Sequence, residues 1–296
     1  MKKYFVIGNP INHSLSPKLQ NRWLKENNID ATYDKIKLDD HEIKNFIQDI
    51  KGQKISGCNV TVPFKKKVIP FLNKLSPEAE QTQSVNTIIK KGGKLIGHNT
   101  DVTAFGETIK DLKRNENDKP LNSLIIGAGG VTPSILFAIK HLNNSASKIY
   151  ITNRTKNNAD KLLAETSKHF TENLKPKIVE WGNVPKDIEL VVNTTTVGLT
   201  KDESLDLDFS DYNDMSNVIF YDLIYNPKKT KFLAYSSINL DDWKPVYLND
   251  NSEKAKKLIS SVAKDEKLIC NKKIKNLSKN SIITNIEKVK KSTKRK

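Results

Sequence analysis

The 296-residue sequence predicts an α/β fold in two units, and three observations lead to that prediction. Segments with strand and helix patterns alternate from the N-terminus onward, which is typical of α/β proteins. Residues 123–152 have the pattern of a strand, a glycine-rich turn, a helix and a second strand, in about the ~30 residues that a βαβ unit needs. Residues 114–120 are polar, lack a pattern and end in proline, so we expect them to link the two units.

The elements of the first unit follow from apolar patterns and from the residues that end them. Ser16 and Pro17 are expected to be the N-cap and the first residue of a helix. Pro63 should end a strand, and residues 91–93 should form the turn of a hairpin. The other expected helices are 40–50, 68–72 and 77–82, and the expected strands are 4–7, 32–38, 55–62, 85–89 and 94–97.

A helix is expected over residues 101–112, before the linker, and the elements of the second unit follow the linker. After the linker, short apolar runs predict strands, and the first two of them belong to one βαβ unit. Pro133 is expected in the first turn of the helix that follows the glycine-rich turn. The expected strands are 123–126, 149–152, 177–180, 190–193 and 218–221, and the helix after the turn is 133–142.

The positive charge of the chain is concentrated at its C-terminal end. Residues 270–296 hold 10 Lys and Arg against one Glu, a net of +9, which leaves +7 of the total of +16 for the rest. We expect this Lys-rich tail to be disordered, with binding to nucleic acid or to a membrane surface as the less favoured interpretations.

Several classes of protein are disfavoured by what the sequence lacks. Cys58 and Cys270 have no CxxC spacing and no His cluster beside them, so neither a zinc site nor a disulfide framework is expected. The apolar stretch after Lys3 is too short for a signal peptide, and no apolar run approaches the length of a membrane span. We therefore expect a cytoplasmic protein with no membrane partner and no metal.

A glycine-rich turn between a predicted strand and a predicted helix indicates a dinucleotide site. In Gly127-Ala128-Gly129-Gly130, the first Gly permits the tight turn and the second allows the backbone to approach a pyrophosphate. Thr132 stands where the fingerprint has its third Gly, so an ordinary βα turn remains the alternative.

The end of the next predicted strand indicates which dinucleotide binds. An NAD site has an acidic residue there, but this chain has Asn153-Arg154-Thr155-Lys156. Because a guanidinium can bind a 2′-phosphate through two hydrogen bonds, the sequence favours NADP over NAD. A solvated basic loop is the alternative.

Three polar segments of the first unit could form a site for a small polar molecule. Ser14 and Ser16 lie two residues apart at an expected helix start, where an anion is favoured, although helix capping by Ser16 alone is the alternative. The second segment contains Asn59, Thr61 and Lys65, and the third joins Asn86-Thr87 with Asn99-Thr100-Asp101. A Lys and an Asp in contact could share protons, but the spacing of Lys65 and Asp101 does not show that they meet.

The polar segments and the dinucleotide signals, taken in this order, resemble the shikimate dehydrogenase family over about residues 4–233. The resemblance rests on GNPINHSLSPKLQN, GCNVTVPFK, SVNT, GHNTD, GAGG, NRT, NTTTVGL and YDLIYNPKKTKFL. It implies an N-terminal α/β substrate domain and a Rossmann-type, parallel-sheet NADP domain. The implied boundaries are 1–102 for the substrate domain, 103–233 for the NADP domain, 234–269 for an atypical return segment and 270–296 for the basic tail.

The resemblance also implies roles for individual residues in the reversible, NADPH-dependent reduction of 3-dehydroshikimate to shikimate. Lys65 would be the acid/base, with Asp101 beside it as the second catalytic residue. Ser14 and Ser16 would bind the substrate carboxylate, and Tyr225 would touch the substrate. Ring hydroxyls would be bound by Asn59, Thr61, Asn86 and Asp101, and the cofactor by Gly127, Ala128, Gly129, Gly130, Val131, Asn153, Arg154, Thr155, Lys156 and Leu223.

The sequence departs from the family pattern in a few places. Gln20 stands where the family commonly has His, and Asn158 stands where a second basic residue often helps to bind the 2′-phosphate. From Ala234 onward, the glycine-rich loop and the helix with a substrate-contacting Gln are missing, although residues 253–264 have a helical pattern. We favour a replaced end, for instance through a frameshift, ahead of divergence to a different terminal structure.

The departures leave two other functions open. One is a related quinate or shikimate dehydrogenase that uses NAD, and the other is an inactive nucleotide-binding relative that lacks the Gln segment. The expected partner is a small-molecule substrate, nucleic acid is not expected, and a homodimer is left open.

Overall fold

The computed structural model of the chain describes residues 1–112, 121–142, 147–200, 203–209, 218–225, 227, 230–235 and 285–288. This part divides into two compact units. The first contains Met1–Thr108 and Pro133–Ile135, and the second contains Ile109–Thr132 and the described residues after Ile135. The expected linker and the expected helix over residues 253–264 lie outside the described residues. The domain boundaries implied by the sequence stay predictions.

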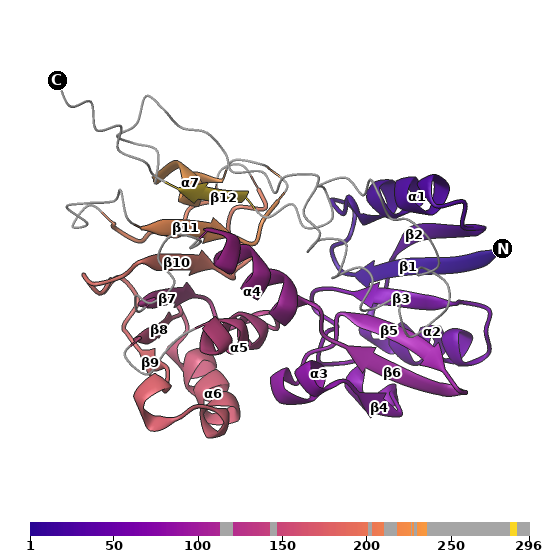
Figure 1. Cartoon of the computed structure of the whole chain (residues 1–296), viewed down its shortest axis with the longest axis horizontal. Helices are drawn as coiled ribbons and strands as arrows, with labels where there is room; N and C mark the ends of the chain where they lie inside the picture. The colour runs from indigo at the N-terminus through magenta and orange to yellow at the C-terminus, as the bar shows by residue number, and fades with distance from the viewer. Residues whose placement is uncertain are drawn as a thin grey trace. The chain divides into compact units, whose positions relative to one another are not determined.

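A single mixed sheet of six strands forms the centre of the first unit, in the order β2-β1-β3-β5-β6-β4 (Figure 1). β1 lies parallel to both β2 and β3, whereas β5 is antiparallel to β3 and to β6. The short strand β4 pairs in parallel with β6. The strands are β1 (Lys2–Gly8), β2 (Ala31–Lys37), β3 (Gly57–Val60), β4 (Lys74–Leu75), β5 (Thr87–Lys91) and β6 (Lys94–His98).

Helices of the first unit cover apolar side chains of this sheet. α2 (Ile43–Lys51) buries Ile43, Phe46, Ile47 and Ile50, which recur at helical spacing and form one apolar stripe. This stripe packs with buried residues of β1, β3, β5 and β6 in one core cluster. The other helices are α1 (Ser16–Glu26), η1 (Asp40–Glu42), η2 (Ile69–Phe71), α3 (Pro77–Thr82) and α4 (Asp101–Leu112).

The register of the strands brings four polar segments to one edge of the first sheet. Ile7 pairs with Val60, so β1 and β3 end side by side. Because β5 is antiparallel to β3 and β6, its first residue Thr87 pairs with both Asn59 and His98. The loops after β1, β3 and β6 and the residue before β5 therefore all lie at this edge.

The second unit contains a sheet in the order β12-β11-β10-β7-β8-β9, with parallel pairing from β11 to β9 (Figure 1). The chain goes from β7 outward through β8 to β9, and then restarts on the other side of β7 with β10 and β11. Such a reversal between neighbouring parallel strands is the switch point at which α/β sheets bind ligands. The strands are β7 (Ser123–Ile126), β8 (Ile149–Thr152), β9 (Lys177–Ile178), β10 (Leu190–Asn193), β11 (Ile219–Asp222) and β12 (Asn285–Lys288).

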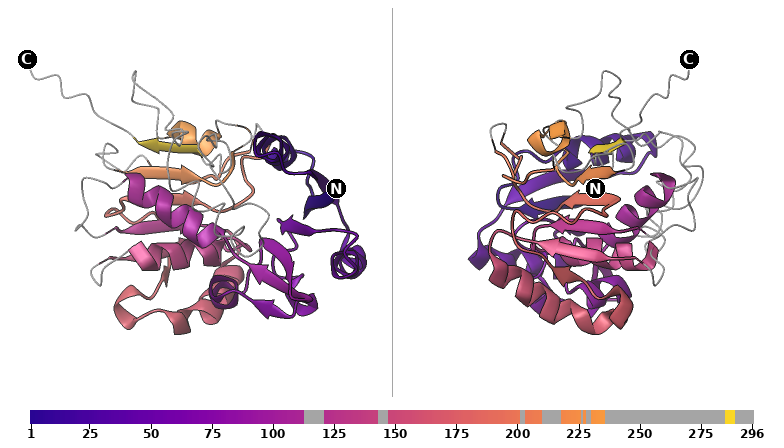
Figure 2. Two further views of the ribbon diagram at one scale, coloured as in Figure 1. Left: turned by 45° about the vertical axis from the view of Figure 1, so that its right-hand side comes forward. Right: turned by 90° about the vertical axis from the view of Figure 1, so that its left-hand side faces the viewer.

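Apolar side chains hold the helices of the second unit against its sheet. All four residues of β7, β10 and β11 are buried, which explains why these strands are apolar runs and not alternating patterns. Phe209 stacks edge-on against Phe220 and Phe232, at centroid distances of 5.3 and 6.2 Å. Two further views show the strand layer with its helices (Figure 2). The helices are α5 (Thr132–Leu142), α6 (Lys156–Thr166), η3 (Ser167–His169), η4 (Glu172–Leu174) and α7 (Lys231–Tyr235).

The α/β fold predicted from the sequence is confirmed, but one helix start was predicted wrongly. The N-cap of α1 is Leu15, and it makes no side-chain capping bond. Ser16 is instead the first residue of the helix, because its backbone N–H donates to the hydroxyl of Ser14 at 3.3 Å. The hydroxyl of Ser14, and not that of Ser16, therefore satisfies a backbone N–H at this helix start.

Other differences concern element length. The helix expected over residues 40–50 is divided into η1 and α2, and the strand expected over 177–180 has only two residues. The tail that the sequence predicts to be disordered contributes the four-residue strand β12, which pairs antiparallel with β11. None of the helices in the described part of the chain is long and apolar enough to cross a membrane.

Candidate functional site

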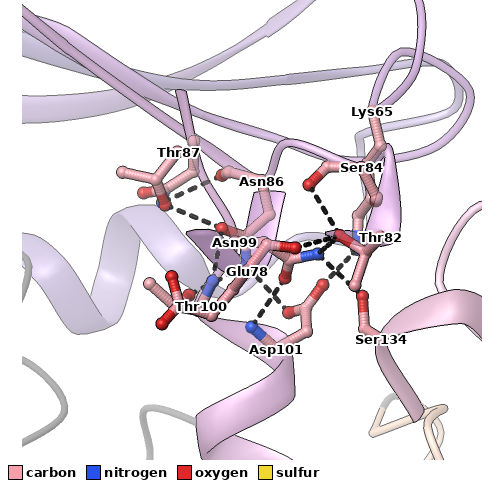
Figure 3. A network of polar contacts seen from close by, with 11 residues as sticks. Lys65, Glu78, Thr82, Ser84, Asn86, Thr87, Asn99, Thr100, Asp101 and Ser134 are labelled. Atoms are coloured by element: carbon pink, nitrogen blue, oxygen red, sulfur yellow. Dashed lines mark hydrogen bonds and ion pairs between the residues drawn. The ribbon is translucent and has the colours of Figure 1, made fainter. Parts of the chain in front are cut away.

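Lys65 and Asp101 form an ion pair at the polar edge of the first sheet (Figure 3). The Lys65 Nζ donates to Asp101 Oδ2 at 2.7 Å, and the two side chains are 12% and 28% exposed. Lys65 reaches this place because the turn after β3 is closed by a bond from Phe64 N to Thr61 O, and Phe64 is buried. Val85 N then donates to the Lys65 carbonyl at 2.9 Å and fixes the backbone.

The carboxylate of Asp101 is held in place by Asn86. The Asn86 amide nitrogen donates to Asp101 Oδ1 and to Thr100 Oγ1, both at 2.8 Å. Its oxygen accepts from Thr100 N at 3.1 Å and from Thr87 Oγ1 at 3.0 Å. An amide has two donors and two acceptor positions, so Asn86 uses its full hydrogen-bonding capacity within the chain.

A second buried amide fixes the start of α4, where Asp101 is the first residue. Asn99 accepts from Asp101 N at 3.0 Å and donates to Thr82 Oγ1 and Ser134 Oγ, both at 2.8 Å (Figure 3). Asp101 is thereby fixed as the first residue of the helix, at its N-terminal end. Backbone and side chain of Asp101 are thus held from different sides.

The remaining predicted substrate residues of this unit lie at the same edge, on β3, in the loops that follow β1 and β3, and at the start of α1. Asn59 is on β3 and its side chain bonds to Tyr33 Oη, Thr87 Oγ1 and the Asn86 carbonyl. Thr61 follows β3, and its backbone N–H donates to the Ile7 carbonyl at 2.9 Å. Within the described residues, the hydroxyls of Ser16 and Thr61 make no hydrogen bond, so both can bind a ligand.

His13 lies in the loop before the two serines. Burial and the charge of Lys35 lower the pKa of His13 below its ordinary value. Its imidazole therefore takes up a proton, and with it a positive charge beside Ser14 and Ser16, less readily than an ordinary histidine.

In the second unit, the glycine-rich turn lies at the switch point between β7 and β10. Gly127 has φ +113°, a conformation that favours glycine. A Cβ on Gly127 would lie 2.6 Å from Thr194 Oγ1 and 2.8 Å from Thr195 Cγ2, in the polar turn after β10. Gly127 therefore permits both the backbone turn and its close packing against the neighbouring turn.

The residue that departs from the dinucleotide fingerprint is accommodated. Thr132 is fully buried at the first position of α5, with its hydroxyl 2.9 Å from Thr194 Oγ1 and 3.3 Å from the Gly127 carbonyl. The third position therefore holds a hydrogen-bonded side chain where the fingerprint has glycine. A Cβ on Gly129 would meet nothing within 4 Å, so the backbone there is open to a ligand such as a pyrophosphate.

The other predicted cofactor residues follow β8 and β11, which flank the central strands β7 and β10. Arg154 and Lys156 are exposed after β8, and Asn153 Nδ2 donates to the Thr155 carbonyl at 2.8 Å. Leu223 N donates to the Asn193 carbonyl at 3.2 Å, which holds the segment of Leu223 and Tyr225 at the carboxyl end of the sheet. These residues fit an anionic dinucleotide, because the exposed basic side chains of Arg154 and Lys156 lie at the carboxyl edge of the sheet, beside the start of a helix.

Comparison with known proteins gives the family of the chain. The family model of the shikimate dehydrogenase substrate binding domain matches residues 6–88. The shikimate dehydrogenase (NADP(+)) of Pelagibacter ubique (strain HTCC1062) is 46% identical over 234 residues, which cover 79% of this chain and 83% of that protein. The chain belongs to the shikimate dehydrogenase family.

Solved structures of the shikimate dehydrogenase family are similar to both units. The shikimate dehydrogenase of Aquifex aeolicus has a TM-score of 0.68 and 31% identity, over 80% of this chain and 83% of that one. Shikimate 5-dehydrogenase from Thermus thermophilus, solved in complex with NADP(H) and shikimate, has a TM-score of 0.65 and 27% identity, over 80% and 84% of the two chains.

Three residues of the site were absent from the sequence-based list. Thr87 and Asn99 lie in segments that the sequence singled out, but their buried contacts depend on strand register. No sequence motif marks Tyr33. Its hydroxyl contacts Asn59 because β2 and β3 lie on either side of β1, and this strand order is not visible in the local sequence. No group of three or more potential metal-binding side chains occurs in the described ranges of the chain.

Two alanine substitutions in the glycine-rich turn are expected to affect different properties, the stability of the fold in one case and the binding of NADP in the other. Gly127→Ala should destabilise the fold by on the order of 1–3 kcal/mol, because of its positive φ and the close threonines. Gly129→Ala should leave the melting temperature unchanged and weaken NADP binding, because its Cβ would occupy space that the ligand needs. Thermal unfolding and fluorescence titration with NADP measure both effects, and equal melting temperatures for the two variants would contradict this account.

Proposed function

We propose that the chain catalyses the reversible, NADP-dependent interconversion of shikimate and 3-dehydroshikimate. The observation that carries this proposal is the ion pair between Lys65 and Asp101, 2.7 Å apart at the edge where the polar segments of the first sheet gather. Membership of the shikimate dehydrogenase family supports the substrate and the cofactor. Aromatic amino acid and chorismate biosynthesis is the pathway in which such an enzyme acts.

Lys65 is the acid and base of the proposed reaction. In the direction of reduction, its ammonium donates a proton to the carbonyl oxygen of the substrate, so that no alkoxide accumulates. In the reverse direction, the neutral amine accepts the hydroxyl proton. Asp101 holds the Lys65 Nζ through one of its three N–H donors and leaves the others for the substrate oxygen.

The substrate carboxylate and ring hydroxyls have separate partners in this proposal. Ser14 and Ser16 bind the carboxylate beside the N-terminus of α1, where the partial positive charge of the helix favours an anion. Asn59, Thr61, Asn86 and Asp101 bind ring hydroxyls, and Tyr225 touches the substrate. Because the amide of Asn86 is already saturated, a hydroxyl there shares one of its existing hydrogen bonds.

NADP is the cofactor, and when bound it supplies or accepts the hydride. The turn from Gly127 to Val131 holds the pyrophosphate through backbone N–H groups at the start of α5. Arg154 would bind the 2′-phosphate with Asn153, Thr155 and Lys156, and Leu223 would contact the cofactor. The location in the cytoplasm and the assembly as a homodimer stay predictions from the sequence.

An assay of the purified chain with shikimate tests the proposed function. We expect an increase in NADPH absorbance with shikimate and NADP, and a much slower reaction with NAD or with quinate. Faster turnover with NAD or quinate would favour the related dehydrogenase instead. Binding of NADP without any turnover would favour an inactive relative with an altered C-terminal end.

Replacement of Lys65 tests its role in proton transfer. Lys65→Ala should lower kcat by roughly 10²–10⁴-fold, because the proton donor of the reaction is lost. The dissociation constant of NADP, measured by fluorescence, should change little. Lys67→Ala is the matched control, since this exposed lysine pairs with exposed Asp40 and surface ion pairs contribute little. Similar activity of the two variants would rule out Lys65 as the acid and base.

Replacement of Arg154 tests the choice of cofactor. Arg154→Ala should weaken NADP binding on the order of 10- to 100-fold, because charge-assisted hydrogen bonds to the 2′-phosphate are lost. Binding of NAD should change much less. Lys161→Ala removes an equal charge from an exposed site on α6 and should affect neither cofactor. An equal loss of affinity for NADP and NAD in Arg154→Ala would refute the phosphate contact.

A further inference from the structure

Tyr33 is buried on β2, and hydrogen bonds of both its backbone and its hydroxyl hold it in place. Its side chain is 7% exposed and packs with Val6 and Ile11 in a small apolar cluster. Asn21 of α1 accepts from Tyr33 N at 2.9 Å and donates to the Tyr33 carbonyl at 2.6 Å. The Tyr33 hydroxyl is thereby fixed 2.6 Å from Asn59 Oδ1.

The orientation of the Asn59 amide follows from the partners around it. The Asn86 carbonyl, 3.3 Å away, can only accept, so the Asn59 atom facing it must be the nitrogen. That nitrogen also donates to Thr87 Oγ1 at 3.0 Å. Asn59 Oδ1 then faces Tyr33, and the Tyr33 hydroxyl must be the donor of their hydrogen bond.

The hydrogen bonds continue in one direction toward the Lys65–Asp101 pair. Thr87 accepts from Asn59 and uses its single proton to donate to Asn86 Oδ1 at 3.0 Å. Asn86 in turn donates to Asp101 Oδ1. Each donor in the series points from Tyr33 toward the carboxylate of Asp101, and hydrogen bonds aligned in this way polarise one another.

These hydrogen bonds leave the side chain of Asn59 with one unused acceptor position, on Oδ1. Both of its N–H groups are taken, and Tyr33 occupies one of the two acceptor positions of Oδ1. A ligand hydroxyl can therefore meet Asn59 only as a donor. Without the Tyr33 hydroxyl, the Asn59 amide would be held from its nitrogen side alone, and Oδ1 would have no partner on its own side.

We propose that Tyr33 is a positioning residue that orients Asn59 so that its Oδ1 accepts a hydrogen bond from a ring hydroxyl of the substrate. This inference rests on the proposed function, in which Asn59 contacts the substrate. Tyr33 acts through Asn59 and does not itself touch the reacting atoms.

Tyr33→Phe removes the hydroxyl and keeps the ring in the apolar cluster. The KM for shikimate should rise roughly three- to tenfold, as expected for the loss of one neutral hydrogen bond, while kcat changes much less. The dissociation constant of NADP should stay as in the wild type, and the melting temperature should fall by only a few degrees, as expected for the loss of one buried hydrogen bond. Tyr4→Phe is the matched control, because Tyr4 pairs with Tyr33 across β1 and β2 and lies against the same cluster.

A double-mutant cycle separates this role from a general structural one. In an Asn59→Ala background, Tyr33→Phe should cause no further increase in the KM for shikimate. An unchanged KM in the single variant would overturn the proposal, and so would an equal increase in both backgrounds. A similar increase in Tyr4→Phe would also overturn it, since the effect would then be general to the sheet.

A measurement independent of turnover distinguishes a failure of this inference from a failure of the proposed function. The side-chain amide signals of Asn59 in a ¹H–¹⁵N correlation spectrum, assigned by their loss in Asn59→Ala, should shift in Tyr33→Phe. Inactivity of the wild type with shikimate would overturn the proposed function alone. Unchanged Asn59 signals would overturn the orienting role of Tyr33, whatever the activity.

Discussion

The arrangement of the site in the first unit depends on the hydrogen bonds of the Asn86 side-chain amide, which has a partner at each of its donor and acceptor positions. It joins the residue before β5 to the segment after β6, and it holds the carboxylate that binds Lys65. These bonds can form only because β5 runs antiparallel between β3 and β6, which brings the three segments to one edge. The side chain is 9% exposed, so loss of its partners would leave buried polar groups unsatisfied, at about 1–3 kcal/mol for each. Fold and site are therefore stabilised by the same hydrogen bonds.

A comparable constraint acts in the second unit, where two turns meet at the switch point of a parallel sheet. Gly127 lies so close to Thr194 and Thr195 that no side chain fits, whereas Thr132 fits because its hydroxyl bonds to Thr194. The fingerprint glycine that matters most for packing is thus the first one. The third position can carry a small hydroxyl side chain here, since the turn after β10 supplies its partner. The hydrogen bond of Thr132 therefore explains why the dinucleotide fingerprint lacks its third glycine in this chain.

The sequence predicted elements well where one physical signal dominated. The bounds of β7, β8, β10 and α4 agree with the prediction, because short apolar runs or a clear helical pattern define them. The wrong cap at Ser16 arose because Ser14 offers the same hydroxyl two residues earlier. Lys65 and Asp101 lie 36 positions apart, and their contact follows from the register of β3, β5 and β6, which local patterns do not encode. Tyr33 was missed for the same reason, since no sequence motif marks its pairing across β1.

The hydrogen bonds of the first unit also limit what a ligand can do there. Groups that already have all their partners, such as the amide of Asn86, form a rigid frame, and a ligand hydroxyl can only share one of their existing hydrogen bonds. A ligand is therefore recognised mainly by groups that still have an unused hydrogen-bond donor or acceptor. These groups differ in whether they can donate, accept or do both. Within the described residues, the Lys65 ammonium keeps two donors, the hydroxyls of Ser16 and Thr61 can donate or accept, and Asn59 can only accept. A ligand that matches this edge needs an oxygen that accepts from Lys65 and a hydroxyl that donates to Asn59. A hydroxylated ring with a reducible carbonyl meets both requirements, and because the frame is already formed, little ordering of the protein opposes its binding.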